Sequence, residues 1–239
     1  MTQAEQPIID FSFAFQPIVD IESHQVFAFE ALVRGPANQS AGSVFAALPS
    51  SQLHAFDRAA RIQAVALAAS LGLNTGLSLN FLPQSLETFA DAITSTLDAA
   101  RTAGLSAQQI FLEVTEGELI RDLARFSASI NQYRSSGIHL AIDDFGAGHS
   151  GLNMLAEFQP DVIKIDMHLV RDIDSRGPRQ AIVRAVIQAC LELGIDVIAE
   201  GVETEAEYRW FKRAGVKLYQ GYLFGRPEFE SLSAPVFAG

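Results

Sequence analysis

Eight short runs of apolar and β-branched residues recur along the chain, and each has the length and composition of a buried β-strand. They lie at about residues 11–18, 25–33, 76–81, 109–114, 138–143, 161–166, 195–200 and 216–221. Between most of these runs, apolar residues recur every three or four positions, which is typical of amphipathic helices. The clearest helical patterns cover residues 54–73, residues 84–104, the segment between Gly117 and Gly137, and residues 178–194.

The repeated unit is therefore strand, helix, strand, which predicts a parallel sheet. Eight strands in a chain of 239 residues favour a closed (β/α)8 TIM-type barrel over an open doubly wound sheet. Only residues 20–24 separate the first two runs, and such a short connection cannot make a parallel crossover. We therefore predict a modified barrel whose first strand is antiparallel and forms a hairpin with the second. Residues 1–239 are expected to form a single domain, with its core at about residues 10–230.

Composition narrows the classes of function. Lys and Arg number 17 and Asp and Glu number 28, so the formal charge is 17 − 28 = −11, which argues against polymeric nucleic acid and anionic membranes as partners. The chain has no pattern of a secretory signal and no run of 18 apolar residues, so we expect a cytoplasmic protein or the cytosolic part of a larger one. Cys190, the single cysteine, cannot form an intrachain disulfide and is expected to pack in the core.

Polar residues close every one of the eight runs. In chain order they are Gln16, Glu30, Asn80, Glu113 with Glu116, Asp143 with Asp144, Lys164 with Asp166, Glu200 with Glu203, and Gln220. Active sites of α/β barrels form at the carboxyl ends of the strands. The polar residues at the strand ends are therefore expected to converge on one functional site.

Electrostatics constrains what this site can hold. Two like charges about 4 Å apart repel by about 4 kcal/mol at an effective dielectric near 20, so several convergent carboxylates need cations. Carboxylate and amide oxygens, with no His or Cys at the strand ends, suit Mg²⁺ or Mn²⁺ and disfavour Zn²⁺. Adjacent Asp143 and Asp144 fit two ions, of which Asp143 would bridge both, and such a pair can clamp a phosphoryl displacement. Lys164 could orient or deprotonate a water molecule there, or it could form a buried ion pair.

A different interpretation arises from the loop after the fifth run. Residues 146–151 match GxGxxG, and Asp166 follows about twenty residues later, as in a dinucleotide-binding fingerprint. That motif needs a pyrophosphate against free amides, but Asp143 and Asp144 immediately precede this loop and would repel it. A nicotinamide-dependent enzyme is therefore disfavoured, because it also leaves the other acids at the strand ends unexplained.

The ordered motifs resemble the EAL family of bacterial cyclic di-GMP phosphodiesterases over about residues 10–230. The matching segments are Glu30 to Arg34 (EALVR), Asn80, Glu113 to Glu116 (EVTE), Asp143 to Gly146 (DDFG), Lys164 to Asp166 (KID), Glu200 to Glu203 (EGVE) and Gln220 to Tyr222 (QGY). The resemblance implies a barrel with one antiparallel strand. It also implies a homodimer that hydrolyses cyclic di-GMP to linear pGpG with two Mg²⁺ or Mn²⁺ ions per site.

Carried over position by position, the resemblance assigns roles to the residues at the strand ends. One ion is expected on Glu30, Asn80, Glu113 and Asp143, and a second on Asp143, Asp144 and Glu200. The catalytic residues would be Lys164, Glu200 and Glu30, while the choice of general base between Lys164, Glu200 or neither stays open. Substrate-binding residues would be Gln16, Leu32, Arg34, Asp166, Glu203 and Gln220. Glu116 would anchor the loop after Asp144.

Departures from the family pattern fall in that loop. Family members often read DFGTGYSSL, whereas this chain reads DFGAGHSGL, with Ala147, His149 and Gly151 at the differing positions. The metal-ligand set is intact, which favours an enzyme, while the departures in the loop bear on loop stiffness, dimer coupling and rate. The alternative is a non-catalytic cyclic di-GMP receptor or signalling interaction module that uses the same pocket.

Overall fold

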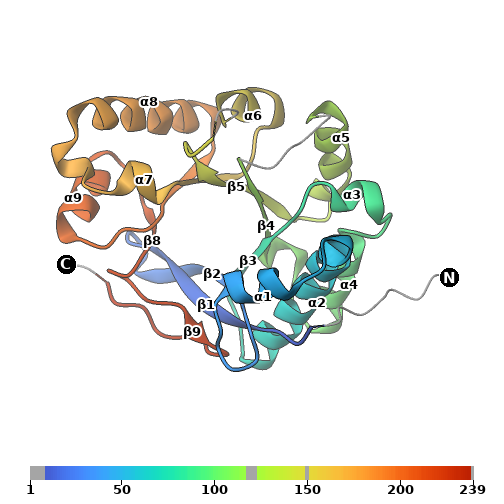
Figure 1. Ribbon diagram of the computed structural model, residues 1–239. Coiled ribbons are helices and arrows are strands. Elements are labelled where there is room, and N and C mark those ends of the chain that lie inside the picture. The colour runs from blue at the N-terminus through green and yellow to red at the C-terminus, as the bar shows by residue number, and fades with distance from the viewer. Residues whose placement is uncertain (1–8, 117–122, 149–150, 238–239) are drawn as a thin grey trace.

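The computed structural model describes residues 9–116, 123–148 and 151–237, and these form a closed barrel with helices around its outside (Figure 1). The parallel strands follow one another in chain order. They are β2 (Gln25–Arg34), β3 (Gly76–Asn80), β4 (Ile110–Thr115), β5 (His139–Phe145), β6 (Val162–Ile165), β7 (Asp196–Ala199) and β8 (Leu218–Gln220). Strand β1 (Ser12–Asp20) closes the ring between β8 and β2. The predicted (β/α)8 TIM-type barrel is therefore confirmed.

Strand β1 runs antiparallel to both of its neighbours in the ring, as the short connection after it predicts. Its register places Gln16 opposite Glu30 and Ile18 opposite Gln220. A short strand β9 (Glu228–Phe229) also pairs with β1, and the apolar pattern did not predict it. The modification of the first strand is confirmed.

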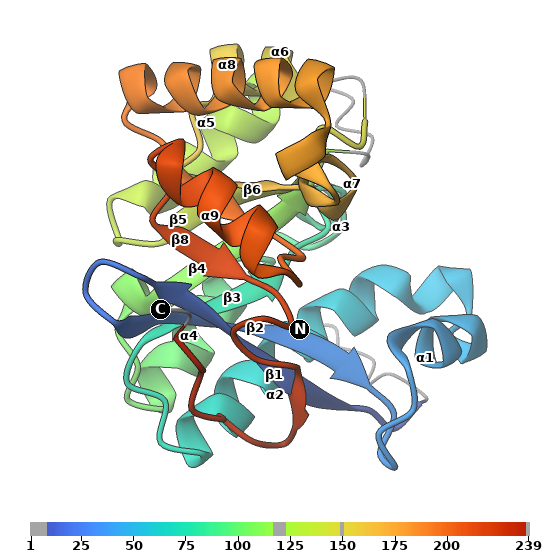
Figure 2. The ribbon, with the colours of Figure 1, turned by 90° about the vertical axis from the view of Figure 1, so that its left-hand side faces the viewer.

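Helices cover the outer face of the barrel (Figures 1 and 2). They are α1 (Ala41–Ala47), α2 (Leu53–Ser70), α3 (Ser85–Thr88), α4 (Thr94–Thr102), α5 (Leu123–Arg134), α6 (Gly151–Phe158), α7 (Met167–Val170), α8 (Gly177–Leu193) and α9 (Glu205–Arg213). In the described part of the chain, no helix combines the length and the apolar character needed to cross a bilayer.

The single helix predicted over residues 84–104 is wrong, because the structure divides it into α3 and α4. Phe89 has extended backbone angles between them, φ −125° and ψ 120°. Buried Arg61 of α2 donates from Nη2 to the carbonyl oxygen of Ala92 at 3.0 Å. This side chain thus takes a backbone acceptor in the segment between the two helices, a tertiary contact that local periodicity does not reveal.

The interior of the barrel changes from apolar to polar within two residues along seven of the eight strands of the ring. The end away from the mouth holds a buried cluster of Ile18, Ala28, Phe111, Ala141, Val162, Ile198 and Leu218. Two positions further toward the mouth, the same strands or their ends carry Gln16, Glu30, Glu113, Asp143, Lys164, Glu200 and Gln220. Residues two apart on a strand share a face, so the apolar cluster forms the floor beneath a ring of polar groups.

Candidate metal centre and active site

Lys164 lies at the centre of the polar ring, with its side chain fully buried. Its Nζ atom lies 2.9 Å from Asp143 Oδ1, 3.1 Å from Glu30 Oε2 and 3.2 Å from Glu113 Oε1. Glu200 Oε2 is 3.7 Å away. One cation therefore faces four carboxylates, which come from β2, β4, β5 and the end of β7. Both predicted uses of Lys164, as a buried ion-pair partner and as a catalytic group, are compatible with this position.

The imbalance between one lysine and four acids perturbs the pKa values of the ring. Burial, reinforced by Glu30 and Asp143, raises the pKa of Glu113 to about 8 even though Lys164 opposes the shift. Burial also raises the pKa of Glu200 well above its usual value. Burial alone would lower the pKa of Lys164, but the carboxylates outweigh it and raise that pKa. Without further cations, the ring therefore favours a charged lysine and partly protonated acids.

The carboxylate oxygens of the ring are arranged to accept more positive charge than Lys164 provides. Two groups of acids have ligand atoms within 4.8 Å of one another: Glu30, Glu113 and Asp143, and then Asp143, Asp144 and Glu200. Asp143 belongs to both groups. Within the described residues, Oε1 of Glu113, Oδ1 of Asp143 and Oε2 of Glu200 are buried and share the single ammonium group of Lys164 as their ion-pair partner, without a well-aligned hydrogen bond of their own. Buried carboxylate oxygens that share one cation fit hard divalent cations, so the residues present fit metal ions.

Asp144 is held at the start of the glycine-rich loop in a left-handed conformation with φ of 53°. Burial and then the neighbouring Asp143 raise its pKa to about 6. Glu116 Oε2 accepts hydrogen bonds from the backbone N–H groups of Gly146 at 2.7 Å and Gly148 at 3.1 Å. The Glu116 carboxylate thus accepts the hydrogen bonds of backbone N–H groups that a pyrophosphate would need, which argues against a dinucleotide-binding loop.

Two glutamines support Glu30 from the antiparallel side of the barrel. Gln220 Nε2 donates to Glu30 Oε2 at 2.5 Å and to Gln16 Oε1 at 3.3 Å, and both amide side chains are buried. Gln16 Nε2 in turn donates to the carbonyl oxygen of Gly225 at 3.0 Å. This chain of donors fixes the orientation of the Glu30 carboxylate beside Lys164.

The remaining predicted residues lie around this ring at different depths. Asn80 pairs in register with Glu113 on the neighbouring strand and is exposed at the mouth. Leu32 lines a cavity of about 260 Å³ between the barrel and the helices α1 and α2. Arg34 donates from Nη1 to the carbonyl oxygen of Val33 at 2.8 Å.

Asp166 and Glu203 make contacts that the strand pattern did not predict. Asp166 is buried and caps α7, accepting from the N–H of His168 at 2.9 Å. Glu203 forms a two-bonded ion pair with Arg171, whose Nη1 and Nη2 lie 2.7 and 3.0 Å from its two oxygens. Arg171 follows a short helix rather than a strand, so the pattern of polar residues at strand ends did not indicate it. Of the loop positions that differ from the family pattern, His149 lies outside the described residues.

The fold is a (β/α)8 barrel, and its mouth carries two overlapping carboxylate groups around a buried lysine. These features are those of a metal-binding barrel protein. The EAL domain family model matches residues 5–227, so the chain belongs to the EAL domain family.

Comparison with known proteins agrees with this assignment. A standalone versatile EAL protein from Vibrio cholerae O395, solved with c-di-GMP bound, is 43% identical with a TM-score of 0.91, covering 96% of this chain and 97% of that one. Klebsiella pneumoniae BlrP1, solved as a manganese and cy-diGMP complex at pH 9.0, is 43% identical with a TM-score of 0.90, covering 97% of this chain and 60% of that one. The blue light- and temperature-regulated antirepressor BluF of Escherichia coli K12 is 36% identical over 96% of this chain, which spans only 57% of BluF.

Proposed function

We propose that the chain is a cytoplasmic, metal-dependent phosphodiesterase that hydrolyses cyclic di-GMP to linear pGpG. The observation that carries this proposal is the position of Lys164 Nζ within 3.7 Å of four carboxylates from four strands. Such a ring serves metal-assisted chemistry on a phosphodiester, since its excess negative charge otherwise repels the substrate. The structures of related EAL proteins with cyclic di-GMP, one of them with manganese, support the choice of substrate and cofactor.

Two Mg²⁺ or Mn²⁺ ions are proposed to bind at the mouth. Glu30, Asn80, Glu113 and Asp143 would hold the first ion, and Asp143, Asp144 and Glu200 would hold the second. The two carboxylate groups that share Asp143 support this division. When bound, the ions would lower the pKa of water and neutralise negative charge on the phosphoryl oxygens.

Hydrolysis adds one water across a ring P–O bond: its oxygen bonds to phosphorus, and the ribose O3′ leaves and takes up a proton. Lys164 stays protonated among the acids, so we assign it as a donor that holds the attacking water or a phosphoryl oxygen. Glu200, whose side chain is 25% exposed against 1% for Glu113, would accept the proton of the water in this proposal. Glu30 is oriented for metal binding by Gln220 and Lys164.

Substrate contacts are assigned by depth. Arg34 and Glu203 are at least partly exposed and would meet a phosphate and a guanine, respectively. Leu32 is also proposed to contact the substrate. Gln16, Asp166 and Gln220 are buried and would hold the groups that touch the substrate. Glu116 would anchor the loop of Asp144 through its hydrogen bonds to Gly146 and Gly148.

A homodimer is proposed as the working assembly. Helices α6 and α8 lie side by side on one side of the barrel (Figures 1 and 2), and both expose large apolar side chains. Leu152 of α6 is 69% exposed and Ile182 of α8 is 58% exposed. Burial of such residues against a second copy would remove them from water. The net charge of −11 gives no basis for contacts with polymeric nucleic acid or an anionic membrane.

A test of the proposed function is incubation of the purified chain with cyclic di-GMP and either Mg²⁺ or Mn²⁺, followed by chromatography for pGpG. Turnover that disappears in Glu30→Ala and Lys164→Ala supports both the activity and the site. The relative BluF is named an antirepressor, which keeps the non-catalytic receptor as the second candidate. Tight cyclic di-GMP binding by calorimetry without turnover in either metal would favour that receptor.

A further inference from the structure

Two glycines follow the proposed ligands of the second ion. Gly146 lies two residues after Asp144, and Gly201 lies directly after Glu200. Both glycines have left-handed backbone angles, with φ of 98° and 69°. A residue with a side chain is strained in this conformation, whereas glycine is not. Because glycine has no Cβ atom, a neighbouring element can also come close to each loop.

The short helix α7 comes close to both loops. A Cβ atom on Gly146 would overlap Cδ1 of Leu169, and a Cβ atom on Gly201 would lie 2.6 Å from Cβ of Met167. Met167 and Leu169 are the first and third residues of α7, so a single turn of helix packs against the loops that follow Asp144 and Glu200.

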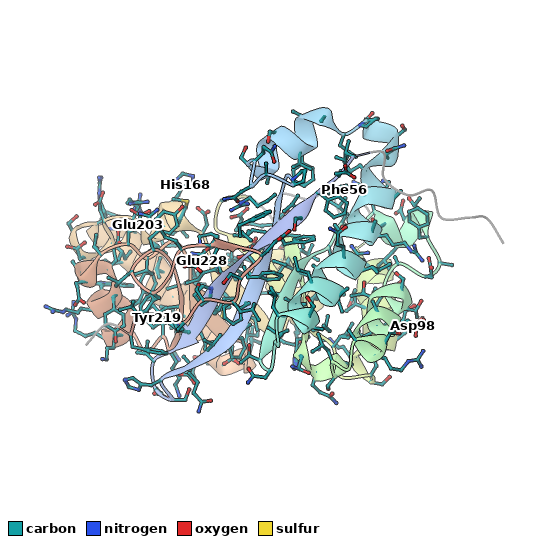
Figure 3. The ribbon with its side chains drawn as sticks, turned by 90° about the horizontal axis from the view of Figure 1, so that it is seen from below. Phe56, Asp98, His168, Glu203, Tyr219 and Glu228 are labelled. Atoms are coloured by element: carbon teal, nitrogen blue, oxygen red, sulfur yellow. The ribbon has the colours of Figure 1, made fainter. Side chains whose placement is uncertain are left out.

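The position of α7 is fixed by strand β6, which lies between β5 and β7. The N–H of Asp166 donates to the carbonyl oxygen of Phe145 at 3.2 Å, and the N–H of Glu200 donates to that of Ile165 at 3.2 Å. At the other end of α7, Arg171 pairs with Glu203. Figure 3 places His168 of α7 and Glu203 on the same side of the barrel. Helix α7 is therefore tied to the segments of both proposed ligands.

We propose that Met167 and Leu169 are positioning residues for the second ion, with α7 acting as a spacer that sets the separation of Asp144 and Glu200. This inference rests on the proposed two-ion site and on no property of the substrate. Leu169 acts from the side of Asp144 and Met167 from the side of Glu200. Neither side chain carries a metal ligand, so their effect must pass through packing.

The test is calorimetric titration of the metal-free protein with Mn²⁺ alone. Wild-type protein is expected to bind two ions. Leu169→Ala opens a gap beside Gly146, and Gly146→Ala overfills the same contact, so each is expected to weaken the second ion about tenfold, as loss of a ligand-orienting partner does. In the double variant, the affinity for the second ion is expected to fall by less than the product of the two single decreases. The reason is that the new methyl group occupies the space that the leucine leaves.

Val170→Ala serves as the matched control. Val170 lies on the same helix and is fully buried, but its atoms are not among the nearest neighbours that a Cβ atom on either glycine would meet. Its replacement is expected to lower the Tm without changing the Mn²⁺ affinity of the second site. Leu169→Met, which keeps the volume, is expected to restore most of that affinity.

Three outcomes overturn the inference: one Mn²⁺ ion in the wild type, equal weakening of both ions in Leu169→Ala, or effects of Leu169→Ala and Gly146→Ala that multiply in the double variant. Failure of the proposed function would instead show as two bound Mn²⁺ ions with no turnover of cyclic di-GMP. The two failures are therefore distinguished by separate measurements.

Discussion

Replacement of Lys164 by methionine removes the single cation from a ring of four carboxylates while keeping a side chain of similar length. The nearest three acids lie 2.9 to 3.2 Å from its Nζ atom. At about 3 Å and an effective dielectric near 20, each such contact is worth up to about 5 kcal/mol before desolvation is counted. Removal of one member of a buried ion cluster usually costs about 3–5 kcal/mol, and we expect a loss of that size in the free energy of unfolding of the metal-free protein at pH 9.

The loss should depend on pH, with a defined sign. The pKa of Glu113 is already raised to about 8 in the folded protein, and loss of Lys164, which lowers it, raises it further. An acid whose folded pKa lies above its unfolded value favours folding at low pH and loses that advantage as the pH rises through the folded pKa. The Lys164→Met variant should therefore fall further below wild-type stability as the pH rises above about 8, where Glu113 ionises in the wild type and stays protonated in the variant.

The assay is urea denaturation of metal-free wild type and Lys164→Met at pH 6 and pH 9, each repeated with Mn²⁺. Mn²⁺ should recover part of the loss at pH 9, because it replaces the missing charge. The control is Lys217→Met, whose partner Glu22 is 2.8 Å away on the surface and whose loss should leave stability unchanged. An equal loss at both pH values, or a variant more stable than wild type at pH 9, would refute the electrostatic reasoning.

Three further predictions concern a buried ion pair of helix α2 and the proposed metal site. Arg61→Met should lower the free energy of unfolding, measured by urea denaturation, by about 3–5 kcal/mol, because it leaves the buried carboxylate of Asp57 without its cation. Arg58→Met breaks the more exposed pair with Asp91 on the same helix and should cost at most about 1 kcal/mol. Glu116→Gln should weaken Mn²⁺ binding, since an amide accepts the two loop N–H groups less strongly than a carboxylate; unchanged affinity in a calorimetric titration would contradict this. Mn²⁺ binding should tighten from pH 6 to 8.5 as Glu113, with a pKa of about 8, and Asp144, with a pKa of about 6, lose their protons, and calorimetry in two buffers should detect proton release.

The barrel could be predicted from sequence because its strands are short apolar runs with sharp ends. Along seven of the eight strands of the ring, the polar residue lies two positions from an apolar residue of the floor, as Ala28 precedes Glu30 and Phe111 precedes Glu113. That spacing is visible in the sequence and depends only on strand geometry. The convergence of the ring on one place then follows from closure of the barrel.

Features that depend on tertiary contacts could not be predicted in the same way. The break between α3 and α4 involves buried Arg61, which is about thirty residues away in sequence. Helix α7 has only four residues, which are too few to show a helical pattern of apolar positions, and it packs against Gly146 and Gly201. Arg171 reaches Glu203 from a loop, so no spacing along a strand indicates the pair.

The most direct test of the proposed metal centre is anomalous diffraction from crystals of this chain soaked in Mn²⁺. The account predicts two peaks at the mouth of the barrel, both within coordination distance of Asp143, with Glu113 on one side and Glu200 on the other. Absence of any peak within reach of Asp143, with Lys164 Nζ still in contact with all four carboxylates, would contradict it.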